Sequence, residues 1–134
     1  MLDSTALQAR TDAFADLAIR FVEGLPDVAR IRRLALQFQD ASTSVGANYR
    51  AARHAKSKAD FTSKIGTVSG EADEAVYWLR RMRNGNIESQ AVPLGRVLDE
   101  AEQLARIFGA AHRTASRRGN RRIARPADDP MTTR

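Results

Sequence analysis

Cysteine is absent from the 134 residues, which excludes a disulfide framework and a thiolate metal site. No uninterrupted apolar run approaches the roughly 20 residues that cross a bilayer. The start of the chain also lacks the basic-then-apolar order of a signal peptide. We therefore expect a soluble cytoplasmic protein that has no membrane partner.

Residues for catalysis are also scarce. The two histidines, His54 and His112, stand alone, and two histidines without a third ligand make a poor metal site. Glu71 and Glu74 share a helix face, yet no histidine or second carboxylate cluster completes an acid–base site with them. There is no glycine-rich phosphate loop and no nucleophile motif. We expect no enzyme activity, no cofactor and no metal.

Helical periodicity, in contrast, is present nearly everywhere. Apolar residues recur every three or four positions, as in Ile31, Leu34, Phe38, Ala41, Val45 and Tyr49, in Phe61, Ile65, Val68, Ala72, Ala75, Leu79 and Met82, and in Leu94, Val97, Ala101, Leu104 and Phe108. The pattern is less regular before residue 25. Such stripes are typical of helices packed at small crossing angles. The chain is predicted to be all-α.

Turn-forming residues divide the pattern into four helices. Gly24 and Pro26 separate the first two, with Asp27 a candidate cap for the second, and Ser57 is a candidate cap for the third. Asn84 and Gly85 close the third helix, and the fourth should start between residues 89 and 93. Short connections force neighbouring helices to be antiparallel. Residues 1–116 are predicted to form an antiparallel up-down-up-down four-helix bundle.

The net charge of +6 belongs mostly to the end of the chain. From His112 onward there are seven arginines against two aspartates, a net charge of +5, whereas residues 1–111 carry only +1. Residues 117–134 contain Gly119, Pro126 and Pro130 and few large apolar residues. We predict that this arginine-rich segment is a disordered tail, because it has too little apolar surface to offset its ordering entropy.

A second group of cations lies between the second and third helices, where no acidic residue occurs from 41 to 59. The antiparallel topology would bring this group and the tail to the same end of the bundle. The predicted nucleic-acid-binding residues are Arg50, Arg53, Lys56, Lys58, Arg113, Arg117, Arg118, Arg121 and Arg122. Without interleaved aromatic residues in the tail, binding should tolerate any sequence, in RNA or DNA. The alternatives are a scaffold that docks an acidic protein partner and a solvated loop without function.

Small side chains cluster in the second half of the second helix, where Gly46 costs about 1 kcal/mol relative to alanine. Close approach of another helix would compensate, either inside the bundle or between subunits. We favour the first for Gly46 alone and the second for the stretch as a whole. The predicted oligomer interface comprises Ser42, Val45, Gly46 and Asn48.

The second and third helices also resemble the bacterial four-helix bundle protein family. That family includes proteins encoded in intervening sequences of ribosomal RNA genes and the accessory variability determinant of diversity-generating retroelements. The resemblance spans residues 7–116 and is carried by Ser42–Arg50, Ser57–Phe61, Lys64–Gly66, Glu71–Glu74 and Tyr77–Leu79. It implies a homopentameric, barrel-like assembly and, from the retroelement members, nucleic acid and a reverse transcriptase as partners. Thr67, Ser69 and Gly70 are more polar or smaller than the family pattern, and the arginine tail extends beyond it.

Overall fold

Four helices make up the molecule in a computed structural model that describes residues 3–85 and 87–128, with side-chain surroundings as far as Asn120. The order is α1 (Ser4–Glu23), α2 (Ala29–Arg53), α3 (Lys58–Arg83), a 3-10 turn η1 (Glu88–Gln90) and α4 (Ala91–Asp128). No strand occurs in the described residues. The predicted all-helical four-helix bundle is confirmed.

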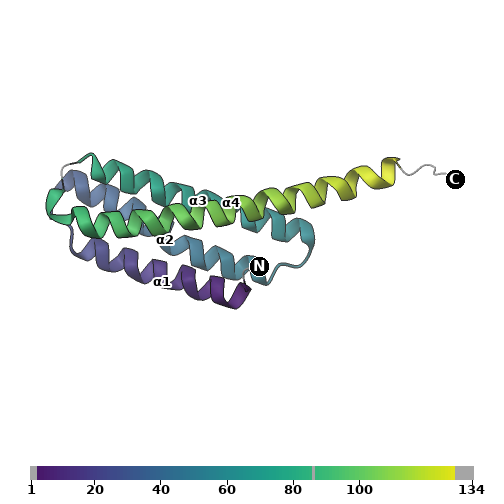
Figure 1. Cartoon of the computed structure of the whole chain (residues 1–134), viewed down its shortest axis with the longest axis horizontal. Coiled ribbons are helices and arrows are strands. Elements are labelled where there is room, and N and C mark those ends of the chain that lie inside the picture. The colour runs from purple at the N-terminus through teal and green to yellow at the C-terminus, as the bar shows by residue number, and fades with distance from the viewer. Residues whose placement is uncertain (1–2, 86, 129–134) are drawn as a thin grey trace.

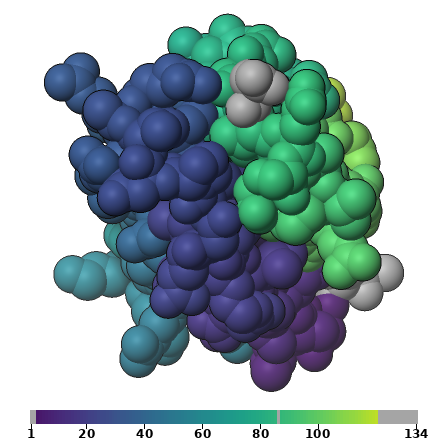
Figure 2. Space-filling view, turned by 90° about the vertical axis from the view of Figure 1, so that its left-hand side faces the viewer, coloured from purple at the N-terminus to yellow at the C-terminus, as the bar shows by residue number. Residues whose placement is uncertain are grey.

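Figure 1 shows how the helices are arranged. Each helix runs back along the one before it, so the α1–α2 connection and η1 lie at one end, and the α2–α3 connection lies at the other end with the start of α1. Figure 2 looks onto the first of these ends, where the α1–α2 connection and the η1 segment meet side by side. Among neighbouring helices, contacts are most extensive between α2 and α3 and between α3 and α4, and least extensive between α1 and α4.

Local sequence signals explain the helix boundaries. Asp3 caps α1 by accepting hydrogen bonds from the backbone N–H groups of Thr5 and Ala6, and Ser57 caps α3 by accepting one from Asp60. The prediction that Asp27 caps α2 is wrong, because Val28 occupies the cap position and makes no side-chain hydrogen bond there. The Asp27 carboxylate instead accepts hydrogen bonds from the guanidinium of Arg32 in α2.

The apolar stripes form one continuous core. Phe14, Phe38 and Phe108 are almost fully buried, each stabilising the fold by about 1.5–3 kcal/mol relative to an exposed side chain. Phe38 packs edge-to-face on Phe21, with ring centroids 6.0 Å apart, and Phe108 packs on Tyr49 at 5.2 Å. These contacts join α1 to α2 and α2 to α4. Helix α3 adds Ile65, Val68 and Leu79, so every helix contributes to the same core.

The α1–α4 contact is held by a polar clamp. The Arg10 guanidinium donates two hydrogen bonds of 2.8 Å to the Glu100 carboxylate and a third of 2.8 Å to Gln103 Oε1. The hydrogen bond and the charge of Glu100 raise the pKa of Arg10, although its partial burial acts in the opposite direction. A bidentate geometry of this kind fixes the orientation of α1 against α4.

Helix α4 extends beyond the bundle. We expected a disordered tail from residue 117, but α4 continues to Asp128, and residues 129–134 lie outside the described part of the chain. Arginine and alanine are among the best helix formers, and extending an existing helix needs no new nucleus. A shortage of apolar residues limits packing, and it does not prevent a helix that already exists from continuing.

Candidate nucleic-acid interface

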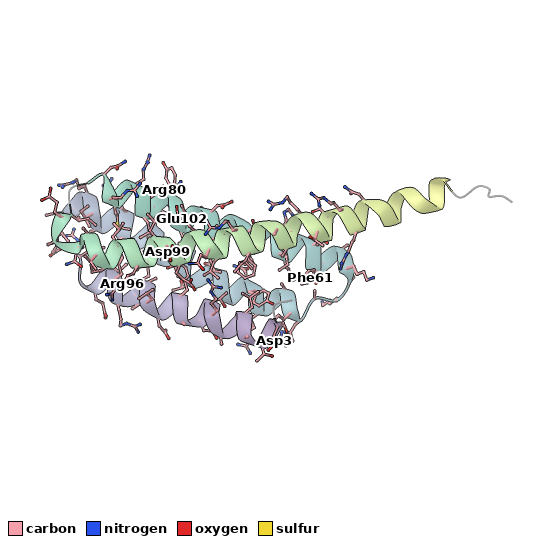
Figure 3. All side chains as sticks on the ribbon, viewed as in Figure 1. Asp3, Phe61, Arg80, Arg96, Asp99 and Glu102 are labelled. Atoms are coloured by element: carbon pink, nitrogen blue, oxygen red, sulfur yellow. The ribbon has the colours of Figure 1, made fainter. Side chains whose placement is uncertain are left out.

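The predicted basic residues gather where α2 ends and α3 begins. Arg50, Arg53, Lys56 and Lys58 are all exposed there, and we call this group the basic end. The start of α1 lies at the same end, as do Asp3 and Phe61 in Figure 3, and α4 projects from it. Predicted residues of α2 and α3 and the extension of α4 thus lie at the same end of the bundle, although Arg50 and Arg53 line a hollow beside α1 and Arg113 lines one between α3 and α4.

Local hydrogen bonds at the start of α3 leave these cations available. Asp60 accepts a hydrogen bond from the backbone N–H of Lys56, 3.0 Å away, and forms an ion pair with Lys64 one turn along α3. These hydrogen bonds, first that of Lys64 and then that of Lys56, lower the pKa of Asp60. The Asp60 carboxylate is therefore paired with Lys64, and neither Lys56 nor Lys58 forms an ion pair with it among the described residues, although the charge of Lys56 also helps to lower its pKa.

The arginines of the basic end also lack a carboxylate partner within the described residues. Arg53 donates a 3.3 Å hydrogen bond to the Thr5 hydroxyl, which orients its guanidinium without reducing its charge. Burial raises the pKa of Tyr49 beneath it, while the charge of Arg53 acts to lower that pKa. Arg50 is exposed and forms no ion pair among the described residues.

Helix α4 adds the remaining predicted cations. Its His112 ring packs so closely on Gly66 that a methyl group on Gly66 would lie 2.9 Å from Nε2. Because the two helices are antiparallel, the turns of α4 after His112 pass the first turns of α3. Arg113, Arg117 and Arg118 are exposed along this part of α4. Arg121 and Arg122, which were also predicted to bind nucleic acid, lie beyond the residues whose side chains the structure describes.

Three arginines at the opposite end are occupied, whereas Arg33 and Arg83 there form no ion pair among the described residues. Arg30 donates a 2.6 Å hydrogen bond to the Gly85 carbonyl, Arg32 pairs with Asp27, and Arg80 pairs with Glu102 at 2.6 Å. Figure 3 shows Arg80 and Glu102 facing each other across α3 and α4. The basic end is thus the better candidate for binding an external polyanion.

Three of the four residues of the predicted oligomer interface are buried within the chain. Ser42, Val45 and Gly46 are buried inside the single chain, so they offer no surface to a second copy. Gly46 faces α1, and a Cβ atom there would lie 3.1 Å from Thr11 Oγ1 and 3.0 Å from Asp12 Oδ1. Close packing within the bundle, the alternative for Gly46 alone, is what the structure shows. Asn48 is partly exposed, and its amide donates to the Ser44 carbonyl at 2.9 Å.

The acidic residues of α3 form a local cluster without a histidine. Burial, followed by the nearby charges of Glu74 and Asp40, raises the pKa of Glu71. No group of three or more histidine, aspartate or glutamate side chains within the described residues could hold a metal ion. Neither Glu71 nor Glu74 pairs with an arginine among the described ion pairs.

A second surface escaped prediction from the sequence. Two adjoining hollows between α3 and α4 share Asp73, Ala105 and Arg106, and their lining includes the exposed Tyr77. The one available sequence signal was the seven-residue spacing from Arg106 to Arg113, which places both on one helix face. Which residues of α3 oppose them depends on how the two helices align, and the sequence does not give that alignment.

No described helix is long and apolar enough to cross a membrane. Comparison of the chain with protein-family models, curated proteins and solved structures gives no match.

Proposed function

We propose that the protein is a homo-oligomeric, up-down-up-down four-helix bundle that binds nucleic acid through its basic end and the adjoining part of α4. One observation carries the proposal: the cations of the basic end have no carboxylate partner in the described chain, whereas several arginines at the other end are held by carboxylate or carbonyl groups. Neutralising phosphates with such cations releases counterions, which supplies most of the free energy of sequence-independent binding.

Oligomerisation would strengthen this binding. A few phosphate contacts on one subunit bind weakly, but in a ring the later contacts become intramolecular and occur at high effective concentration. The family resemblance supports five subunits and a role as an accessory protein to a reverse transcriptase in a diversity-generating retroelement. Because Ser42, Val45 and Gly46 are buried within the chain, subunit contacts would use the partly exposed Asn48 or other surfaces.

A filter-binding titration tests the proposal with a 30-base-pair DNA duplex and a 30-nucleotide RNA. The test variant replaces the four cations of the basic end with glutamine. Its control removes the same charge elsewhere, from four exposed arginines, Arg20, Arg33, Arg83 and Arg96. If all four basic-end cations contact phosphates, the slope of log K against log salt should fall by about 3 in the test variant, at roughly 0.7–0.9 per contact.

Two results would contradict the proposal. Equal losses in the test and control variants would show that only total charge matters. Undetectable binding at low salt by the intact protein would favour the alternative, a scaffold that docks an acidic protein partner through the same cations. Light scattering coupled to gel filtration tests the assembly separately, and a monomer mass at micromolar concentration would refute the oligomer.

A further inference from the structure

The two hollows between α3 and α4 form one surface, which we call the α3–α4 groove. Its lining includes Tyr77 and Arg81 on α3 and Arg106, Gly109 and Arg113 on α4. Because Asp73, Ala105 and Arg106 line both hollows, the groove is continuous along the two helices. It leads from the middle of the bundle toward the part of α4 that adjoins the basic end.

Positive charge in this groove exceeds negative charge. Arg80 and Glu102 neutralise each other through their 2.6 Å ion pair. Arg106 and Arg113 are exposed and have no carboxylate partner among the described ion pairs, and Asp73 is the one further acidic residue lining the groove. The groove is therefore suited to a polyanion.

The arginines follow a single line on α4. Arg106, Arg113 and Arg117 are separated by seven and four residues, which keeps them on one face of the helix. At 1.5 Å per residue this line is about 16 Å long, and it joins the groove to the exposed extension of α4. A strand lying in the groove would meet successive cations without changing direction.

The groove also offers an aromatic surface. The Tyr77 side chain is 51% exposed, and its ring is held on two sides. Trp78 packs against it in a T-shaped arrangement, with centroids 4.9 Å apart, and the Arg81 guanidinium lies over one face of the ring, 5.1 Å from its centroid, so a base would stack on the other face. A fixed, exposed ring beside arginines is the kind of platform on which an unstacked base can stack.

The floor of the groove is low. Ser69 and Ala105 are small, and Gly109 has no side chain. A Cβ atom there would lie 3.4 Å from Arg113 Nη1 and 3.9 Å from Ser69 Oγ, so the Arg113 guanidinium lies close to the helix at this point. A sugar–phosphate backbone can therefore approach the helices between the arginines. In a duplex the bases are paired and stacked on one another, so they could not reach Tyr77.

We propose that the α3–α4 groove binds single-stranded nucleic acid, with a base stacked on Tyr77 and phosphates held by Arg106 and Arg113. This inference rests on the proposed function and names the class of strand that the protein takes. An acidic peptide would satisfy the arginines equally well but would make no specific use of the exposed ring.

The protein itself provides a reporter, because Trp78 is its single tryptophan and contacts Tyr77. We expect a 20-nucleotide oligodeoxythymidine to change the emission of Trp78 and a 20-base-pair duplex to leave it unchanged. Affinity for the oligonucleotide should fall roughly fivefold or more in Tyr77→Leu, because base–aromatic stacking is lost, and should be retained in Tyr77→Phe. Arg106→Gln should reduce the salt slope by about 0.7, whereas Arg96→Gln, on the same helix outside the groove, should not.

Several results would overturn the inference. One is an equal loss in Tyr77→Leu and Tyr77→Phe, and another is an equal response of Trp78 to duplex and single strand. A poly-glutamate peptide that binds with the same dependence on Tyr77 would assign the groove to an acidic protein. A change in oligomer mass in Arg106→Gln, with oligonucleotide affinity unchanged, would assign it to a subunit contact. If duplex binding at the basic end persists in any of these cases, the groove inference fails alone and the proposed function stands.

Discussion

Two glycines of the bundle lie in opposite environments, and alanine substitution should separate them. Alanine in a helix interior is favoured over glycine by about 1 kcal/mol. At Gly70 nothing lies within 4 Å of the added Cβ, so the full gain should appear. Gly70→Ala should therefore raise the free energy of unfolding by about 1 kcal/mol and the melting temperature by about 3–5 °C.

At Gly46 the same gain is opposed by steric crowding. The added Cβ would lie 3.0 Å from Asp12 Oδ1 and 3.1 Å from Thr11 Oγ1. Thr11 is fully buried and donates a 2.7 Å hydrogen bond to the Gln8 carbonyl, so it cannot move aside freely. Overpacking typically costs about 1–3 kcal/mol, so Gly46→Ala should be neutral or destabilising by up to about 2 kcal/mol.

Urea denaturation followed by circular dichroism measures both variants under the same conditions. The prediction concerns the difference between them, about 1–3 kcal/mol in favour of Gly70→Ala. Equal stabilisation by the two substitutions would refute the close packing of α1 against α2 at Gly46. A loss of assembly in Gly46→Ala with stability unchanged would instead return Gly46 to a subunit interface.

Two further substitutions test polar interactions of the bundle. A double-mutant cycle of Arg10→Met and Glu100→Gln, measured by urea denaturation, should give a coupling free energy of about 0.5–1 kcal/mol, because the ion pair is bidentate and only partly exposed. A coupling free energy near zero would show that the clamp does not stabilise the α1–α4 contact. The raised pKa of Glu71 means that its ionisation opposes folding, so its contribution is favourable at low pH and is lost as pH rises through the folded pKa. Glu71→Gln should raise the melting temperature at pH 7 and have a smaller effect at pH 4, and a variant that is less stable at pH 7 would contradict this.

The core was predictable because it depends on spacing alone. Phe38, Ile65 and Phe108 recur at helical intervals with their neighbours, and all three are buried. Thr11 was not expected in the core, because a hydroxyl needs a partner there. Its own helix supplies that partner, the Gln8 carbonyl one turn earlier, so a threonine can be buried without an unsatisfied donor.

The candidate site was less predictable than the core. The grouping of Arg50 and Lys56 with α4 follows from the order of short connections, which the sequence contains. Two features depend instead on the axial alignment and the rotation of the helices. These are the packing of Gly46 against α1 and the position of Tyr77 and Arg106 in one hollow between α3 and α4. Both are set by side-chain packing between segments far apart in the chain, so periodicity within one helix cannot supply them.

The extension of α4 allows charge to be separated from helical order. A Cβ atom added at Gly119 would have nothing within 4 Å, so Gly119→Ala should strengthen the helix by about 1 kcal/mol, whereas Gly119→Pro should break it at a cost of about 3 kcal/mol. Both variants keep every arginine, and neither touches the core. If the line from Arg113 to Arg117 and beyond acts as a rigid helix, affinity for a duplex should rise in the first variant and fall in the second, with the bundle's melting temperature unchanged in both. Equal affinity in the two variants would mean that the arginines act as a flexible chain, as the sequence alone had predicted, because counterion release depends on the number of charges and hardly on their order.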